Sequence, residues 1–256
     1  MSGSPPQGYD RRRVRRSTVV ARHDILPALV DILAHGGLYE YAASRPDRVE
    51  LAGRGPAYAI GLTPSGTRVV VRHNRHGGLL ARATGDLFLR PTRAPRELTV
   101  SLRLAAAGIP TPVVVAYVTY GVAGVLARAD VVTREIAPAR DLGAFLARSE
   151  PDARRAAALD ATIALVDALA RVGARHHDLN VKNVLLRPDG DAFEALALDV
   201  DRVTFQAGDV MTANVARLSR SARKWRERQG ATVDESELAV LARSVFEASL
   251  SAVTRS

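Results

Sequence analysis

One polar turn constrains this chain more than any other segment. It reads His176-His177-Asp178-Leu179-Asn180-Val181-Lys182-Asn183, follows an apolar helix-like segment, and precedes two apolar runs, the second of which ends at Asp199. Phosphoryl transfer requires one carboxylate for the acceptor hydroxyl, then an amide and a second carboxylate for Mg²⁺. Asp178, Asn183 and Asp199 supply these groups in that order. The joint pattern predicts a phosphotransferase, although each residue by itself is common in ordinary turns.

Each residue of this pattern has an expected role. Asp178 orients the acceptor hydroxyl and accepts its proton. Asn183 and Asp199 hold one or two Mg²⁺ ions, because this hard cation prefers oxygen ligands. His176 is expected to make a structural hydrogen bond to the loop backbone. Two interpretations of Lys182 stay open: it neutralises charge on the transferred phosphoryl group, or it points to solvent.

Composition restricts the class of protein. The 256 residues include no cysteine, which excludes disulfides, thiolate metal sites and thiol nucleophiles and fits a reducing, cytoplasmic compartment. No apolar run is long enough to span a bilayer. The net charge of +9, mostly arginine, suits phosphates or an anionic membrane surface. Nucleic-acid binding is not expected, because aromatic residues make up only 5% and no recognition motif is present.

The chain divides into three predicted parts. Residues 1–17 read as a disordered basic tail, because glycine, serine and proline precede a cluster of arginines. A twin-arginine export signal is not expected, since Arg22, His23 and Asp24 interrupt the segment where its apolar core should follow. Residues 18–132 are expected to form an N-lobe that covers the nucleotide, and residues 133–256 a helical C-lobe that carries the catalytic loop.

The N-lobe pattern favours a twisted antiparallel sheet with one helix. A short helix is expected over residues 25–38, a hairpin within 49–71, a helix over 93–107, and strands at 113–118, 122–127 and 131–133. Gly53 and Gly55 occupy the place of a phosphate-covering loop, or of a simple turn. In the C-lobe, helices are expected at 141–147, 153–172 and 211–229, with a last one opened by the capping pair Asp234 and Glu237. The predicted class is α+β, two-lobed and protein-kinase-like.

Several segments together resemble the bacterial lipopolysaccharide kinase family, most closely its 3-deoxy-D-manno-octulosonic acid (Kdo) kinases. They are Arg72-His73 with Gly77-Gly78, residues 93–97, Gly108-Ile109-Pro110-Thr111-Pro112, the motif around Asp178, and Asn214-Val215-Ala216-Arg217-Leu218-Ser219-Arg220-Ser221. The resemblance covers about residues 36–228. It implies a protein-kinase-like fold, use of ATP with Mg²⁺, and phosphorylation of a Kdo hydroxyl on the lipopolysaccharide inner core, in a Kdo-lipid A precursor.

The resemblance also implies that Glu97 pairs with a basic strand residue over the α- and β-phosphates. The chain has no lysine before Lys182. Arg72 is therefore the candidate, because a guanidinium can bridge phosphate oxygens and a carboxylate; a plain surface arginine, or Arg68 in this role, are the alternatives. His76 stands where the family tends to carry arginine. After Asp199 the chain reads Val200-Asp201-Arg202, and Asp201 is either a further metal-shell carboxylate or a solvated turn residue.

Two other functions remain open. The chain can be a kinase for another small-molecule or protein hydroxyl, or a pseudokinase that binds nucleotide without turnover; the joint presence of Asp178, Asn183 and Asp199 argues against the latter. Peripheral contact with the anionic inner membrane is a further expectation. It rests on the basic helix that carries Arg217, Arg220, Arg223, Lys224, Arg226 and Arg228, which can equally be an ordinary solvated face.

Overall fold

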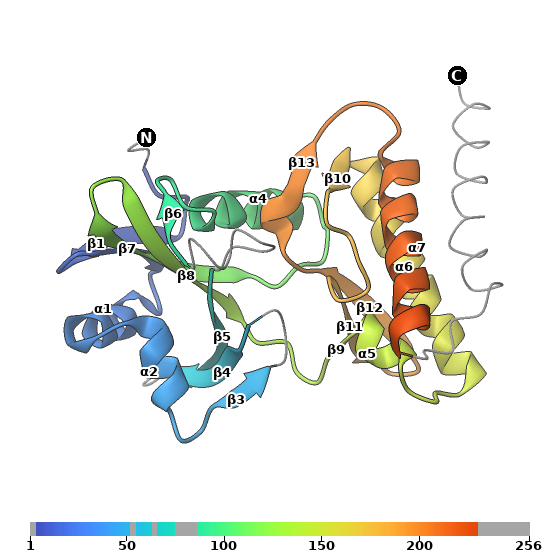
Figure 1. The fold of residues 1–256 in the computed structure, drawn as a ribbon, viewed down its shortest axis with the longest axis horizontal. Coiled ribbons are helices and arrows are strands. Elements are labelled where there is room, and N and C mark those ends of the chain that lie inside the picture. Colours follow the sequence, from blue (N-terminus) through green and yellow to red (C-terminus); the bar gives the residue numbers. More distant parts are fainter. Residues whose placement is uncertain (1–3, 52–54, 63–65, 75–85, 230–256) are drawn as a thin grey trace. The chain divides into compact units, whose positions relative to one another are not determined.

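The computed structural model describes residues 4–51, 55–62, 66–74 and 86–229 (Figure 1). The chain forms two compact units. The first comprises Met1–Leu102 and Pro112–Glu135, and the second comprises Arg103–Thr111 and Ile136–Ser256. No helix in the described ranges is long and apolar enough to cross a membrane.

The first unit is built on an antiparallel sheet. Its main path runs through β1 (Tyr9–Val14), β2 (Ser17–Arg22), β7 (Val114–Ala123), β8 (Leu126–Arg134), β5 (Thr67–His73), β4 (Ala57–Leu62) and β3 (Val49–Leu51). The short strand β6 (Phe88–Leu89) pairs with β8 off this path. Alternation of β-branched residues sets which face of each strand is buried, because successive side chains point to opposite faces. Val69 and Val71 of β5, for example, are both fully buried.

Helices cover both faces of this sheet. Helices α1 (Leu26–His35) and α2 (Leu38–Ser44) pack against one face, where Leu29 and Leu38 join Val19 in a single buried cluster. Helix α4 (Ala94–Ala106) packs its Leu98 against Val20 on the other face. Neighbouring residues of β2 thus serve two different cores. The expected helix over residues 25–38 is in fact two helices, since α1 ends before Gly36 and α2 begins at Leu38.

Two expectations for this unit are wrong. The basic segment before Ser17 is not a disordered tail: β1 pairs with β2 along its whole length, and Tyr9, which is buried, donates its hydroxyl to the Val114 carbonyl at 2.6 Å. The arginine side chains of β1 point to solvent, and its backbone forms the hydrogen bonds with β2. The expected strand at 122–127 is the tip of the β7–β8 hairpin, where Gly124 takes the left-handed φ of 50° that a tight turn requires.

The second unit surrounds the polar motif around Asp178 with helices and two small sheets. The helices are α5 (Leu142–Leu146), α6 (Asp152–Arg171) and α7 (Val210–Gln229). One sheet joins β12 (Ala192–Ala197), β11 (Val184–Asp189) and β9 (Arg140–Asp141), and the other joins β10 (Ala174–His176) and β13 (Val203–Phe205). Helix α6 packs on β12 and on α7. The helix expected after Asp234 lies outside the described residues.

A glycine, Gly173, forms the turn between α6 and the strand that leads into the motif around Asp178. Gly173 has a left-handed φ of 65°, and a Cβ there would lie 2.4 Å from the carbonyl oxygen of Gln206. Only glycine fits this close approach. Strand β10 begins at the next residue, so the turn at Gly173 sets the direction in which the motif leaves the helix.

Candidate active site

Strand β10 and two buried side chains hold the motif in place within the second unit. His177 donates its backbone N–H to the Arg202 carbonyl at 3.1 Å, which continues the pairing of β10 with β13. Leu179 and Val181 are buried beneath the loop, with exposed fractions of 0% and 1%. Burial of these apolar residues anchors the loop while the polar residues between them stay available.

His176 is a structural residue, as expected. Its Nδ1 accepts the backbone N–H of Asp178 at 3.2 Å, and its Nε2 lies 2.8 Å from the Leu198 carbonyl. A carbonyl only accepts, so Nε2 carries the proton and the ring is neutral. Burial lowers the pKa of His176 and outweighs the opposing effect of the Leu198 carbonyl. The ring therefore ties Asp178 to the segment that leads into Asp199.

The Asp178 carbonyl organises the rest of the loop. It accepts the side-chain amides of Asn180, at 2.9 Å, and of Asn183, at 2.8 Å. Asn180 in turn accepts the Lys182 backbone N–H at 2.9 Å through its Oδ1. These bonds fix the backbone on both sides of the Asp178 side chain, whose carboxylate is 16% exposed. The loop is thus rigid where a general base must be placed accurately.

Asn183 and Asp199 are brought together by their backbones. Leu198 donates its N–H to the Asn183 carbonyl at 2.9 Å, so Asp199 follows directly after this bond. Because the Asn183 Nδ2 binds the Asp178 carbonyl, its Oδ1 remains for a cation. Asp199 adopts a left-handed φ of 52°, a conformation that Asp tolerates better than most residues.

This pair of oxygen donors fits Mg²⁺. Mg²⁺ is commonly held by one or two protein oxygens together with water and nucleotide phosphates, rather than by an all-protein cage. Among the described residues, no group of three or more His, Cys, Asp or Glu side chains is placed to hold a metal ion. The metal roles of Asn183 and Asp199 remain predictions.

Helix α7 fastens the loop through one row of polar side chains; two of them, Asn214 and Ser221, lie in the segment that carries the family resemblance, but this role was not expected. Asn214 is fully buried, donates to the Ala174 carbonyl at 3.0 Å and accepts the His176 N–H at 2.9 Å. Ser221 accepts the Val181 N–H at 3.2 Å, and Trp225 donates to the Gly143 carbonyl at 3.0 Å. These residues lie on one helical face, because Asn214 and Ser221 are seven residues apart, about two turns, and Ser221 and Trp225 are four residues apart, about one turn. The polar spacing within a buried face was the signal available in the sequence.

The same row places an arginine at the expected base. Arg217 donates from Nη2 to Asp178 Oδ1 at 2.6 Å, with its side chain 44% exposed. Lys182, in contrast, is exposed and its Nζ lies over the ring of Trp225, 5.0 Å from the centroid. A cation from α7 therefore contacts Asp178. The catalytic role expected of Lys182 remains a prediction.

In the first unit, Arg72 of β5 pairs with Glu97 of α4, as the sequence indicated. Glu97 is 3% exposed, and a buried carboxylate of this kind needs a cationic partner. Arg68, the alternative, pairs instead with Glu135. The contact of Arg72 with phosphate remains a prediction. Gly53 lies outside the described residues, and Gly55 precedes β4, so the proposed glycine loop remains untested.

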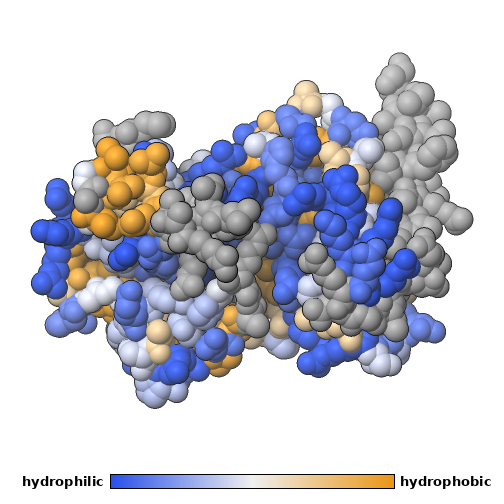
Figure 2. All heavy atoms as spheres, viewed as in Figure 1, coloured by the Kyte–Doolittle hydropathy of each residue, from blue (hydrophilic) through white to orange (hydrophobic). Residues whose placement is uncertain are grey.

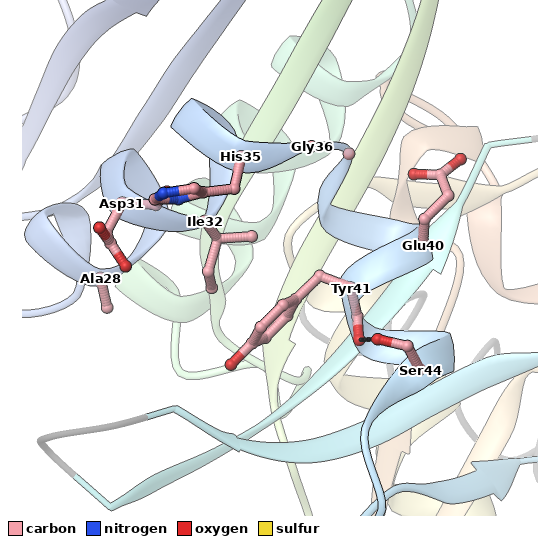
Figure 3. A pocket seen from close by; sticks show the side chains of 9 residues that line it. Ala28, Asp31, Ile32, His35, Gly36, Glu40, Tyr41 and Ser44 are labelled. Atoms are coloured by element: carbon pink, nitrogen blue, oxygen red, sulfur yellow. Dashed lines mark hydrogen bonds between the residues drawn. The ribbon is translucent and has the colours of Figure 1, made fainter.

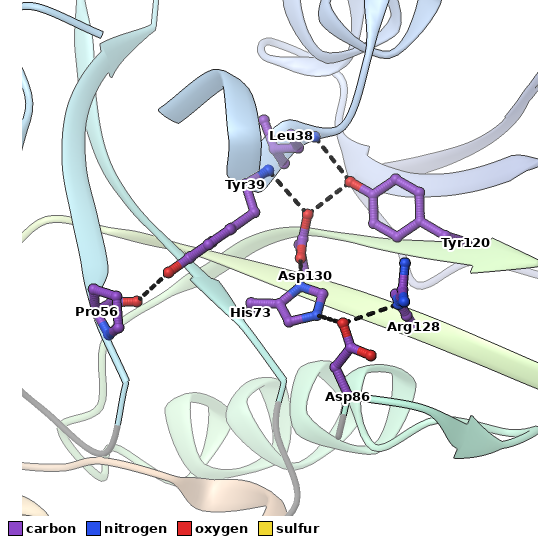
Figure 4. A network of polar contacts seen from close by, with 8 residues as sticks. All are labelled: Leu38, Tyr39, Pro56, His73, Asp86, Tyr120, Arg128 and Asp130. Carbon is purple, nitrogen blue, oxygen red and sulfur yellow. Dashed lines mark hydrogen bonds and ion pairs between the residues drawn. The ribbon is translucent and has the colours of Figure 1, made fainter. Parts of the chain in front are cut away.

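Next to Arg72, His73 lies between two carboxylates (Figure 4). Its Nδ1 is 2.5 Å from Asp130 Oδ1 and its Nε2 is 3.0 Å from Asp86 Oδ2, which also accepts from Arg128 at 2.9 Å. Burial lowers the pKa of His73, but the hydrogen bonds and charges of Asp130 and Asp86 outweigh it and raise the pKa above its ordinary value. The carboxylates thus favour an imidazolium at this position.

Asp130 extends this network to α2. Its Oδ2 accepts the Tyr39 N–H at 3.1 Å and the Tyr120 hydroxyl at 2.6 Å, and the Tyr120 oxygen accepts the Leu38 N–H at 3.0 Å. Burial and the nearby carboxylate raise the pKa of Tyr120. The first turn of α2 is thereby joined to β8 and to the end of β5 where Arg72 lies. The sequence analysis quoted His73 but did not foresee this network.

A cavity of about 430 Å³ opens beside α1 and α2 (Figure 3). Its lining includes Asp31, His35, Glu40 and Tyr41. None of the residues expected to act in phosphoryl transfer lines it. The cavity therefore adds nothing to the candidate site.

Comparisons with known proteins agree with these observations. Residues 50–236 match the profile of the "Lipopolysaccharide kinase (Kdo/WaaP) family". A 3-deoxy-D-manno-octulosonic acid kinase of Vibrio vulnificus (strain YJ016) is 34% identical over 182 residues, which cover 68% of this chain and 72% of that protein. One of Haemophilus influenzae (strain 86-028NP) is 30% identical over 179 residues, covering 67% and 73%.

A solved structure, "WaaP in complex with acyl carrier protein", has a TM-score of 0.56 and 19% identity, and covers 90% of this chain and 88% of that chain. At this identity the likeness concerns the fold, and it confirms the kinase-like α+β class expected from the sequence.

Proposed function

The chain belongs to the lipopolysaccharide kinase (Kdo/WaaP) family of phosphotransferases with an alcohol group as acceptor, and we propose that it transfers the γ-phosphate of ATP to a hydroxyl of Kdo in a Kdo-lipid A precursor. The names of the relatives from Vibrio and Haemophilus support this acceptor. The observation that carries the proposal is the loop in which the Asp178 carbonyl, Asn183 and the Leu198 backbone are joined by direct hydrogen bonds.

In this reaction the acceptor oxygen attacks the γ-phosphorus, the bond from that phosphorus to the ADP oxygen breaks, and the hydroxyl proton passes to the Asp178 carboxylate. Asn183 and Asp199 would hold Mg²⁺, which when bound neutralises charge on the phosphate oxygens. His176 keeps the Asp178 backbone in place and does not itself exchange a proton, because it is buried and neutral.

Arg72 takes the part of the usual strand lysine in this proposal. Its guanidinium can bind the α- and β-phosphates while Glu97 holds it, because five N–H donors serve two partners at once. The His73 network supports this arrangement, since it fixes the end of β5 immediately beside Arg72.

Arg217 supplies the positive charge beside Asp178. A general base must approach a reaction centre that carries several negative phosphate oxygens, and a neighbouring guanidinium reduces the repulsion. The direct contact of Arg217 with Asp178 favours this residue over Lys182.

The proposal includes a place of action. A lipid-linked acceptor is presented at a membrane surface, so the enzyme works from the cytoplasmic side in peripheral contact with anionic lipid. The charge of +9 supports this contact, because each basic residue near such a surface contributes about 1 kcal/mol.

The test is transfer of labelled γ-phosphate from ATP to purified Kdo-lipid A precursor with Mg²⁺. Wild type should label the lipid, and Asp178→Asn should not. Asp189→Asn is the matched control, because Asp189 is an exposed carboxylate at the end of β11. Asp178-dependent labelling of a different alcohol, with none of Kdo, would refute the acceptor. Tight binding of Mg-ATP without transfer to any acceptor in a panel would indicate a pseudokinase.

A further inference from the structure

An apolar patch lies at one end of the sheet of the first unit. Leu89 of β6 and Val125 in the β7–β8 turn are 69% and 64% exposed, the highest values among the large apolar residues that the structure describes, and Val122 of β7 is 41% exposed. The space-filling view shows apolar side chains gathered at this end of the unit, with hydrophilic ones beside them (Figure 2). Single exposed apolar residues are ordinary, but a cluster of them indicates a contact surface.

Backbone contacts bring Leu89 next to the turn that holds Val125, two residues beyond the end of β7, the strand that carries Val122. Leu89 is the cross-strand partner of Leu126, and Arg90 donates its N–H to the Val125 carbonyl at 2.9 Å. The end of β6 therefore lies beside the tip of the β7–β8 hairpin. Leu89, Val122 and Val125 are called the hairpin patch below.

Arginines border the hairpin patch. Arg90 is exposed, and its guanidinium lies close to Gly121, so that a Cβ at this position would be 2.5 Å from the Arg90 Nη2. Gly121 also donates its N–H to the carbonyl of Arg16, an exposed residue in the turn between β1 and β2. The neighbouring strand β1 carries three more exposed arginines, namely Arg11, Arg12 and Arg13. Apolar tips bordered by cations fit the boundary between headgroups and acyl chains of an anionic bilayer.

We propose that the hairpin patch and the bordering Arg16 and Arg90 form a docking surface for an anionic membrane. The aliphatic side chains enter the outer part of the acyl region, and the guanidiniums bind lipid phosphates. This inference rests on the proposed function, because a lipid-linked acceptor gives the enzyme a reason to be held at a bilayer. It is a different surface from the arginines of α7, for which membrane contact remains an expectation.

Vesicle sedimentation tests the docking surface. The full chain should bind vesicles that contain phosphatidylglycerol and bind poorly to pure phosphatidylcholine, and added salt should weaken the binding. Leu89→Ser with Val125→Ser should lower the partition coefficient at least tenfold. Arg16→Gln with Arg90→Gln should lower the partition coefficient about 20- to 30-fold, because the binding free energies of two headgroup contacts are lost together. The matched control is Val49→Ser with Leu51→Ser, which changes two exposed apolar residues of the edge strand β3.

Activity measured with two acceptors separates this inference from the proposed function. One acceptor is the Kdo-lipid A precursor in vesicles, and the other is its deacylated, water-soluble form. The patch variants should lose activity on the vesicles and keep wild-type activity on the soluble acceptor, which also demonstrates that they fold. Equal vesicle binding by the Leu89/Val125 variant and wild type would overturn the docking surface, as would binding to an acidic protein in place of lipid. A wild type without activity on either acceptor would instead overturn the proposed function.

Discussion

Asn214 provides a direct test of how α7 holds the loop around Asp178. Its side chain is fully buried and makes one bond to the Ala174 carbonyl and one to the His176 N–H. Asn214→Ala removes both partners and leaves two buried backbone groups of β10 without hydrogen bonds. Each such group costs about 1–3 kcal/mol, so the free energy of unfolding of the second unit should fall by about 2–6 kcal/mol. A water that enters the space would bring the loss toward the lower figure.

The single tryptophan of the chain makes this effect measurable. Trp225 lies on α7 and donates to the Gly143 carbonyl, so its fluorescence reports unfolding of the second unit. A loss of about 4 kcal/mol corresponds to a decrease in Tm of about 8–16 °C for a unit of this size. Phosphoryl transfer should fall as well, since His176 positions Asp178. The Tm of Asn214→Asp should lie between those of wild type and Asn214→Ala, because the aspartate keeps an acceptor for the His176 N–H.

Two results would refute this reasoning. One is a Tm of Asn214→Ala within about 2 °C of wild type. The other is an equal loss in Arg220→Ala, in which an exposed residue of the same helix is truncated and only small effects of helix propensity are expected.

Other consequences concern charge. The folded-state pKa of His176 is lowered, so its contribution to stability is complete above about pH 6.5 and is lost as pH falls through the folded pKa. His176→Gln should flatten this part of a stability-versus-pH curve measured by Trp225 fluorescence. His73 has a raised pKa, so its contribution is complete below about pH 6.5 and is lost as pH rises through the folded pKa; His73→Gln should remove that slope, of at most about 1.4 kcal/mol per pH unit, in the circular dichroism melt. Arg72→Ala should raise the KM for ATP about tenfold or more while Arg72→Lys restores part of it; an unchanged KM would exclude a phosphate contact. Arg217→Gln should lower kcat about 10- to 100-fold with little change in the KM for ATP, whereas Lys182→Gln should change kcat less than threefold; the reverse order would return the catalytic charge to Lys182.

Local sequence patterns were sufficient for much of the fold. The helical spacing of apolar residues predicted α4, α6 and α7 closely, and the motif identified the loop that contains Asp178 and Asn183. These features depend on neighbours within a few residues. The Arg72–Glu97 pair was expected from the family resemblance, which pairs the helix acid with a basic strand residue, and Arg72 was preferred to Arg68 for this place.

What failed depends on contacts between distant segments. An arginine-rich stretch looks disordered by composition, yet β1 is ordered by pairing with β2 and by Tyr9, whose bond to Val114 spans 105 residues. The turn at Gly124 interrupts a run of apolar residues that reads as a strand. Arg217 was assigned to a surface face, because no local pattern reveals that it contacts Asp178 across 39 residues of sequence.

The central claim is that this chain phosphorylates a Kdo hydroxyl with Asp178 as the base. Mass spectrometry of the Kdo-lipid A precursor after incubation with Mg-ATP tests it most directly, with fragmentation to locate the added group. We expect one additional phosphate on the Kdo residue with wild type and none with Asp178→Asn. ATP consumed while the lipid stays unchanged, or a phosphate that appears on Kdo equally with Asp178→Asn, would contradict it.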